Sequence, residues 1–310
     1  MQCVTDFDFT LTKFWSSDQI DVTVEAQSSP SSSSLSTVVS ATSQVDALPH
    51  RVRLHSWYTL SLRDTRFIHF CSHKVLEDCG LLSETYHERA QALQRHYYPL
   101  EVSPDLDMES KTRYMIEWVT QAHDLLRESN ATRTIIHTAT KRAIFEENLR
   151  LRGFAPELIT LLDAYGVPIL VFSAGIADII ETALEIVLPR VVPRLHVIAN
   201  RCIFIEDVLT DFEQPLIHVF NKRAATYRNS SAFFAQDDLQ NRRNLLLLGD
   251  SLGDVNMSDG LDFDCCIRIG FLNDREERLP EYLKNFDVVI LGDSNLDYVF
   301  NLVKSIVAGS

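Results

Sequence analysis

Asp6 and Asp8 stand two residues apart at the start of the chain, in the stretch DFDFTLT at residues 6–12. Residues 3–5 are β-prone, so Asp6 is expected at the carboxyl end of a buried parallel strand, where open α/β sheets bind ligands. A carboxylate there can attack phosphorus if a cation offsets the repulsion between two anions. Asp8 can protonate the leaving oxygen and then deprotonate the attacking water. A turn or a helix cap uses the same residues, so the pair alone leaves both interpretations open.

A second acidic loop follows an apolar run far downstream. The run NLLLL at 244–248 ends in GDSLGD at 249–254, a pattern that predicts a buried strand entering a tight loop. Magnesium takes oxygen ligands, including one or two protein carboxylates. Asp6 and Asp250 fit that need, with Asp254 in support; the alternative is an acidic turn after a core strand. Asp259 and Asp264 are interpreted as solvated loop acids.

Two further segments could bind an anion. The apolar residues 167–172 precede Ser173, Ala174 and Gly175, and a helix is expected over 176–188. The Ser173 hydroxyl and the backbone N–H groups that open this helix could bind a phosphate, although the same residues are common at helix starts. Lys222, in FNKR at 220–223, could neutralise phosphoryl oxygens or could be a solvated lysine.

The elements that must position these residues follow from hydrophobic periodicity. Helical spacing predicts helices over 74–98, 108–127 and 132–151. From residue 156 onward, helices alternate with apolar runs, the pattern of a parallel sheet covered on both faces. These runs span residues 167–172, 195–199, 245–248, 266–269 and 288–291. The fold class is therefore α/β.

Composition excludes some partners. The 310 residues carry a formal net charge of −14, which argues against nonspecific binding to nucleic acid polymers or anionic membranes. Six cysteines lack the spacing of a disulfide framework, and we find no signal peptide or membrane-spanning run, so a cytoplasmic location is expected. Cys71, His73 and Cys79 do not match the spacing of a zinc finger.

The order D-x-D-x-T, strand-Ser, Lys, G-D-S-x-x-D resembles the haloacid dehalogenase superfamily of magnesium-dependent phosphohydrolases. The resemblance is closer to the cytosolic 5′-nucleotidase III family, also called the pyrimidine 5′-nucleotidases. It rests on DFDFTLT (6–12), FSAGIAD (172–178), HVFNK (218–222), LGDSLGD (248–254) and IGFLND (269–274). It covers the start of the chain and nearly everything from about residue 71.

The resemblance implies roles for residues at matching positions. Asp6 resembles the family's nucleophile, Asp8 its acid/base and a backbone-carbonyl magnesium ligand, and Asp250 its third metal ligand. Ser173 and Lys222 resemble its phosphate binders. The implied cofactor is therefore Mg²⁺.

The family also implies how a nucleobase is recognised. Glu117, in YMIEW at 114–118, resembles a glutamate on a cap helix that contacts the base, and His73 resembles a second base-contacting position. Without the resemblance, Glu117 could instead be a solvent-exposed helix residue beside an apolar stripe. In the family the cap closes over the site, so the cap would set base specificity and the core would carry out the phosphate chemistry.

The resemblance implies a Rossmann-like core of the haloacid dehalogenase type at 1–15 and 152–310, with a helical cap domain at 67–151. Residues 16–66 depart from the family; the serine-rich part from 16 to about 47 is expected to be a disordered linker, either a true insertion or a mistranslated intron. Five residues precede Asp6 where the family has a full strand. If so short a strand failed to pair, the nucleophile would be poorly fixed.

Three functions remain under consideration. The first is a magnesium-dependent 5′-nucleotidase that hydrolyses nucleoside 5′-monophosphates, pyrimidine ones (CMP, UMP) in particular, through an aspartyl phosphate on Asp6. The second is a related phosphatase for 7-methylguanosine monophosphate or a sugar phosphate, because the core motifs contact only phosphate. The third is a catalytically silent binding protein on the same fold. A monomer is expected in each case.

Overall fold

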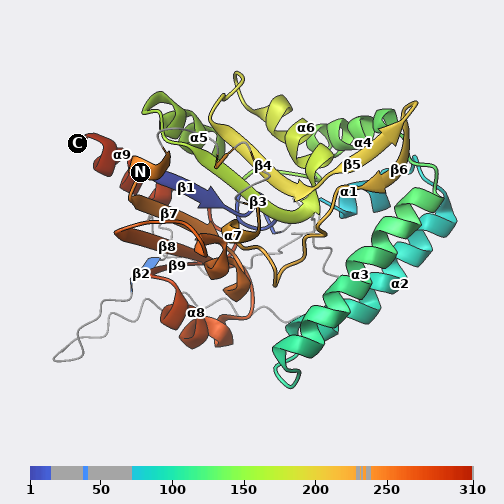
Figure 1. Ribbon diagram of the computed structural model, residues 1–310, viewed down its shortest axis with the longest axis horizontal. Coiled ribbons are helices and arrows are strands. Elements are labelled where there is room, and N and C mark those ends of the chain that lie inside the picture. The colour runs from blue at the N-terminus through green and yellow to red at the C-terminus, as the bar shows by residue number, and fades with distance from the viewer. Residues whose placement is uncertain (15–37, 41–71, 228–230, 232, 235–238, 309–310) are drawn as a thin grey trace, which may run out of the picture.

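The computed structural model describes residues 1–14, 38–40, 72–227, 231, 233–234 and 239–308. Its centre is a sheet with strand order β2-β9-β8-β7-β1-β3-β4 (Figure 1). The strands are β1 (Gln2–Thr5), β2 (Val38–Ser40), β3 (Ile169–Ile176), β4 (Leu195–Asn200), β7 (Asn244–Gly249), β8 (Cys265–Leu272) and β9 (Val288–Leu291). Every neighbouring pair is parallel except β2 and β9. The predicted parallel-sheet α/β core is confirmed.

The short first strand lies in the middle of this sheet. Cys3 and Val4 pair with β3 on one side and with β7 on the other, and all four residues of β1 are buried. The concern that the strand could fail to pair is therefore wrong, because two neighbours supply its backbone hydrogen bonds. The backbone position of Asp6, which directly follows β1, is therefore fixed by the sheet.

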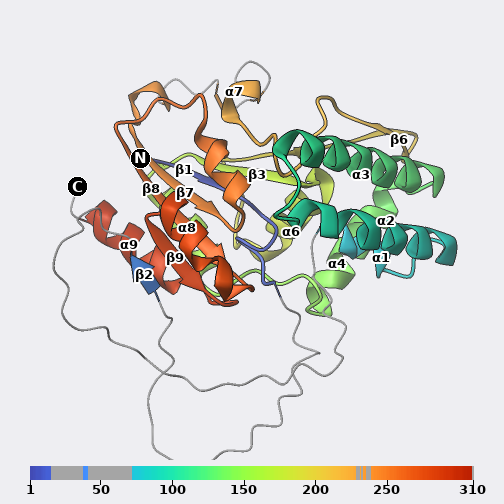
Figure 2. The same ribbon diagram turned by 90° about the horizontal axis from the view of Figure 1, so that it is seen from below.

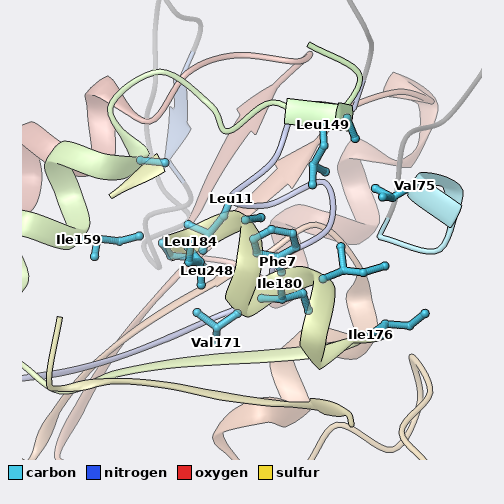
Figure 3. Close-up of a cluster of buried hydrophobic side chains, with 14 of the residues drawn as sticks. Phe7, Leu11, Val75, Leu149, Ile159, Val171, Ile176, Ile180, Leu184 and Leu248 are labelled. Carbon is cyan, nitrogen blue, oxygen red and sulfur yellow. The ribbon is translucent and has the colours of Figure 1, made fainter. Parts of the chain in front are cut away.

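Successive strand residues face opposite sides of the sheet, and both sides are buried. One side packs against α5 (Ala155–Ala164), α6 (Ala177–Val187) and α9 (Asp297–Ala308). The other side packs against α7 (Ala224–Tyr227), α8 (Leu279–Asn285) and the 3₁₀ segment η3 (Leu252–Ser258). Figure 3 shows Phe7 and Leu11, from the loop after β1, inside the first of these cores. That loop is anchored by packing as well as by its strand.

The chain between β1 and α5 forms α1 (Lys74–Glu77), α2 (Glu84–Val102), α3 (Met108–Glu128) and α4 (Arg133–Phe145). Helices α2 and α3 lie side by side, away from the sheet (Figures 1 and 2). The side chains of Ser83, Asp107 and Thr132 accept hydrogen bonds from the N–H groups that open α2, α3 and α4. The predicted helix over 74–98 is two helices, because Gly80 adopts a φ of +64° and Ser83 starts a new helix.

A hairpin that the sequence did not reveal joins these helices to the core. Strands β5 (Cys202–Ile205) and β6 (Val208–Phe212) pair antiparallel, and β6 packs against α3. Their turn places Glu206 at φ 49° and Asp207 at φ 74°, positions usually taken by Asn or Gly. The Thr134 hydroxyl donates to Asp207 Oδ2 at 3.0 Å, so the start of α4 supports this turn. The hairpin therefore brings residues of the predicted core against the predicted cap.

Most of the predicted insertion at 16–66 lies outside the described residues. Within it, Val38–Ser40 form β2 and pair antiparallel with β9. Two more 3₁₀ segments, η2 (Leu239–Asn241) and η4 (Glu276–Arg278), flank the later strands.

Among the described residues, no helix is both long and apolar enough to cross a bilayer.

Candidate active site

Three carboxylates meet at the carboxyl edge of the sheet. Asp6 follows β1, Asp250 follows β7, and Asp254 lies in η3; one oxygen from each lies within 4.8 Å of the others. Strands β1 and β7 are parallel neighbours, so their ends deliver Asp6 and Asp250 to the same edge. A Cβ on Gly249 would lie 2.4 Å from the Asp254 Cβ, so a glycine is needed for the close approach of this loop.

Lys222 supplies the positive charge at this cluster. Its Nζ lies 3.0 Å from Asp6 Oδ2 and contacts Asp254 Oδ1, and the side chain is 2% exposed. Burial alone would lower the pKa of Lys222, but the carboxylates of Asp254 and Asp6 raise it above its usual range, so the lysine stays charged. Asn200 holds the preceding loop, since its side chain exchanges two hydrogen bonds of 2.9 Å with the backbone of Ile217.

In the predicted phosphate-binding segment, the strand extends further than the apolar run at 167–172 indicated. Strand β3 continues through Ser173, Ala174 and Gly175, and α6 begins at Ala177. The helix expected over 176–188 is found as α6, one residue shorter at each end, while Ser173, Ala174 and Gly175 form the irregular end of β3. The Gly175 N–H donates to Ser173 Oγ at 3.0 Å, which orients the buried hydroxyl.

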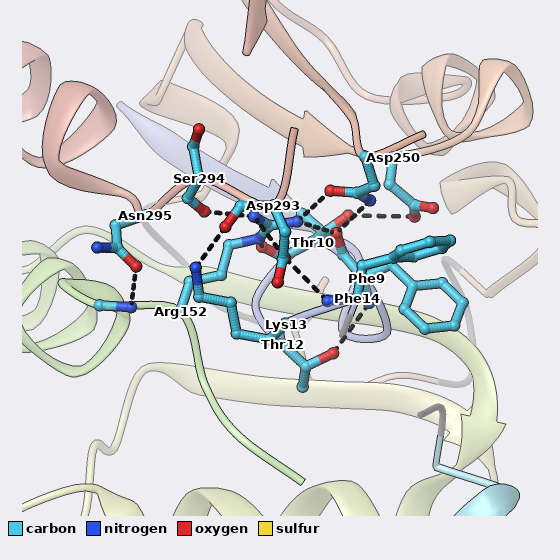
Figure 4. A network of polar contacts seen from close by, with 12 residues as sticks. Phe9, Thr10, Thr12, Lys13, Phe14, Arg152, Asp250, Asp293, Ser294 and Asn295 are labelled. Carbon is cyan, nitrogen blue, oxygen red and sulfur yellow. Dashed lines mark hydrogen bonds and ion pairs between the residues drawn. The ribbon is translucent and has the colours of Figure 1, made fainter. Parts of the chain in front are cut away.

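A buried arginine shapes the loop that carries both N-terminal aspartates (Figure 4). Arg152 is fully buried and donates to the carbonyl oxygens of Phe9 at 2.7 Å and Thr10 at 3.0 Å. Phe9 adopts a φ of 60°, an unfavourable conformation for a bulky residue, and these hydrogen bonds stabilise it. The Thr10 hydroxyl donates to Asp250 Oδ1 at 3.3 Å. Asp293 Oδ1 lies 3.2 Å from Arg152 Nη1 and balances the arginine charge.

The acidic groups of the site hold protons unusually well. Burial raises the pKa of Asp6 to about 7, with Lys222 opposing the shift and the charges of Asp254 and Asp8 adding to it. Burial also raises the pKa of Asp8 to about 6, and raises that of Asp250 well above its usual range. Three clustered carboxylates face one lysine, so the cluster has excess negative charge and an all-oxygen donor set. These residues fit a hard divalent cation such as Mg²⁺.

The acidic cluster opens into a cavity of about 230 Å³ between the sheet edge and α2 and α3. The predicted residues that line it are Asp6, Asp8, His73, Ser173, Ala174, Gly175, Lys222 and Asp250. Asp254 lies behind them, with its Oδ2 accepting from the N–H groups of residues 250 and 251. A larger open groove, of about 930 Å³ along α6 and β4, contains none of the predicted site residues.

Glu117 does not belong to this cavity, which corrects its predicted place. It is exposed on α3, whereas its neighbours Met115 and Trp118 line the cavity. The acid that α2 presents to the cavity is Glu101, and burial raises its pKa to about 7. Glu101 was not among the predicted site residues; the signal was an acid three residues after the second of the aromatic residues 97–98, near the end of a helix.

Stabilisation of the protein by Mg²⁺ should increase as the pH rises from about 5 to about 7.5. The raised pKa values of Asp6 and Asp250 mean that the metal-free fold gains stability from protonation at low pH and loses it as these groups ionise. A cation requires the ionised forms, so its binding releases protons. The melting temperature with Mg²⁺ minus that with EDTA should grow from near zero to at least about 5 °C.

The difference between the two melting temperatures separates the effect of the acidic cluster from that of other buried titratable groups. Burial lowers the pKa of His73 and His123 to about 4 and about 3, and these shifts affect both samples equally. Asp250→Asn should abolish the Mg²⁺ effect at pH 7.5, whereas Asp264→Asn, at an exposed pair with Arg243, should preserve it. A Mg²⁺ effect that is constant across this pH range would contradict the cation site.

The matching family and the similar proteins described below are all 5′-nucleotidases. Residues 63–307 match the family described as pyrimidine 5′-nucleotidase (UMPH-1). A 7-methylguanosine phosphate-specific 5′-nucleotidase of Gallus gallus is 36% identical over 241 residues, covering 76% of this chain and 80% of the relative. The protein of the same name from Homo sapiens is 35% identical over 241 residues, covering 76% of this chain and 77% of the relative.

Solved structures extend the comparison to the start of the chain. The crystal structure of cytosolic 5′-nucleotidase IIIB bound to cytidine has a TM-score of 0.70 and 26% sequence identity. It covers 98% of this chain, and the match spans 86% of that structure. The family match begins at residue 63, so it does not include Asp6 and Asp8, whereas the structural match covers nearly all of the chain.

Proposed function

Because this chain belongs to the pyrimidine 5′-nucleotidase family, and is thereby a phosphoric monoester hydrolase, we propose that it hydrolyses nucleoside 5′-monophosphates through a phosphorylated Asp6. One observation carries the proposal: Asp6, Asp8 and Lys222 open together on a cavity between the sheet edge and the helices α2 and α3. Family membership removes the reason to prefer a silent binding protein. The predicted monomer, the cytoplasmic location and the lack of nucleic acid or membrane partners stay predictions.

The proposed reaction has two steps. In the first, a carboxylate oxygen of Asp6 attacks phosphorus while Asp8 gives its proton to the 5′-oxygen, and the nucleoside leaves. In the second, water attacks the aspartyl phosphate while Asp8 takes a proton from it, which releases phosphate and restores Asp6. A carboxyl group with a pKa of about 6 can perform both proton transfers near neutral pH. Ser173 and Lys222 would bind the phosphoryl oxygens in both steps.

Asp6 and Asp250 would hold Mg²⁺ with side-chain oxygens, and Asp8 with its backbone carbonyl. When bound, the ion supplies positive charge that offsets the repulsion between the nucleophile and the phosphate. Asp254 serves this arrangement indirectly. Its Oδ1 contacts Lys222 and its Oδ2 accepts from the Asp250 N–H at 3.1 Å, so it fixes both partners.

The substrate base has two candidates. The family description and the cytidine complex favour a pyrimidine such as that of CMP or UMP. The names of the relatives favour 7-methylguanosine, whose base carries a positive charge. Trp118 and Glu101 line the cavity and suit such a cation, through the ring face and the carboxylate respectively. Turnover of CMP, UMP, GMP, 7-methylguanosine monophosphate and a sugar phosphate decides between them; preference for the sugar phosphate would defeat the nucleotide proposal.

Glu101→Gln should reduce the preference for 7-methylguanosine monophosphate over GMP by about tenfold in kcat/KM. The change removes the carboxylate charge that distinguishes a cationic base from a neutral one and retains the shape of the side chain. Glu117→Gln is the matched control, because this residue is exposed on α3 and lies outside the cavity. If Glu117→Gln changes the preference and Glu101→Gln does not, the sequence-based assignment to Glu117 is restored.

A further inference from the structure

One residue outside the predicted set touches the carboxylate of Asp8 directly. The Ser72 N–H donates to Asp8 Oδ1 and the Ser72 hydroxyl donates to Asp8 Oδ2, each at 2.8 Å. Two hydrogen bonds from one residue to the two oxygens of a carboxylate fix both its position and the plane of the group. Each oxygen keeps a second lone-pair direction for proton exchange.

The contact between Ser72 and Asp8 is buried and depends on the absence of a side chain at Gly175. Ser72 is fully buried. A Cβ on Gly175 would lie 2.1 Å from Ser72 Oγ and 3.0 Å from Asp8 Oδ2. Only a glycine at the end of β3 therefore leaves room for the hydroxyl and the carboxylate to meet. The contact joins three segments that are far apart in the sequence.

Ser72 also belongs to the helical part that covers the cavity. It is followed by His73, which lines the cavity, and then by α1, which packs against α2 and α4. The same short segment therefore contacts the acid/base group through one residue and the ligand cavity through the next. A displacement of this segment would remove both hydrogen bonds from Asp8.

We propose that Ser72 is a positioning residue that holds the carboxyl group of Asp8 in the orientation needed for proton transfer to the 5′-oxygen. This inference rests on the proposed function, because it needs Asp8 to be the acid. Ser72 itself exchanges no proton with the substrate. Its role is to limit the rotation of Asp8, so that the proton is delivered where the leaving oxygen lies.

Leaving-group dependence tests this role. The first irreversible step, which kcat/KM reports, requires a proton on a nucleoside 5′-oxygen but not on 4-nitrophenolate, a far better leaving group. Ser72→Ala should therefore lower kcat/KM for the nucleotide by about 10- to 100-fold and for 4-nitrophenyl phosphate by less than about threefold. Ser72→Cys, with a weaker donor of similar size, should give an intermediate selective loss, and it provides a second variant if the alanine variant does not fold.

Ser83→Ala is the matched control. This serine caps α2 through its hydroxyl, at 3.2 Å from the Tyr86 N–H, and does not contact Asp8. Its loss should lower the melting temperature and leave the ratio of the two kcat/KM values unchanged. Equal losses on both substrates in the Ser72 variants, or a matching change of ratio in Ser83→Ala, would overturn the inference by showing a merely structural effect.

Asp8→Asn separates this inference from the proposed function. If Asp8→Asn loses nucleotide turnover while both Ser72 variants keep the wild-type substrate ratio, only the role of Ser72 is refuted. If Asp8→Asn keeps nucleotide turnover, the assignment of Asp8 as the acid fails, and the role of Ser72 fails with it. A selective loss in Asp8→Asn and in the Ser72 variants alike supports both.

Discussion

Asp6→Asn should lower kcat for the preferred nucleotide by at least about 10⁴-fold. The amide retains the shape of the side chain but cannot form the aspartyl phosphate. The position is otherwise ready for attack, since Asp6 follows a strand paired on both sides and its Oδ2 lies 3.0 Å from Lys222 Nζ. Steady-state turnover at saturating Mg²⁺ measures the loss, and acid-quenched phosphoprotein should form in the wild type only.

The same variant should be at least as stable as the wild type without metal. Burial and the neighbouring charges of Asp254 and Asp8 hold the pKa of Asp6 at about 7, so ionised Asp6 is unfavourable in the metal-free fold at pH 8. A neutral amide removes this cost, and the melting temperature should not fall. Asp264→Asn, on the surface, should leave both turnover and melting unchanged. More than about a tenth of wild-type kcat in Asp6→Asn would refute the nucleophile assignment.

Much of the sheet could be predicted because its strands are buried on both faces and so appear as continuous apolar runs. The run at 245–248 and the strand at 288–291 are found where expected, with β7 one residue longer at each end. Acids placed directly after such runs converge for a geometric reason: parallel neighbours end at one edge. This is why Asp6 and Asp250 could be paired from residues that are far apart in the chain.

The features that escaped prediction depend on tertiary contacts. The turn at Glu206 and Asp207 has no Asn or Gly, and the α4 terminus supports it only after folding. The resemblance to the family pointed to Glu117 on a cap helix, and periodicity does not show which residues of a helix face a cavity, so Glu101 was missed. Ser72 is an ordinary serine until Gly175 and Asp8 are brought beside it.

Lys222→Met should lower kcat/KM for the nucleotide by about 10³-fold. The lysine is 2% exposed and is the cation that contacts both Asp6 and Asp254. Its removal takes positive charge from the place where phosphoryl oxygens would gather. It also leaves the three carboxylates, including Asp250, without that compensation, so the metal-free protein should be destabilised by about 3 kcal/mol. Urea unfolding in EDTA measures the second effect.

Lys74→Met separates lost charge at phosphate from the general cost of losing a buried lysine. Lys74 is 6% exposed, its Nζ lies 3.4 Å from Glu77 and 3.3 Å from Asp78, and it does not line the cavity. This variant should also lose stability, while its kcat/KM should fall less than about tenfold. Similar losses of activity in the two variants would mean that Lys222 acts through stability alone. A loss that is confined to Lys222→Met and persists at saturating Mg²⁺ would support a direct action of the lysine charge on the phosphoryl group, because added metal would then not replace it.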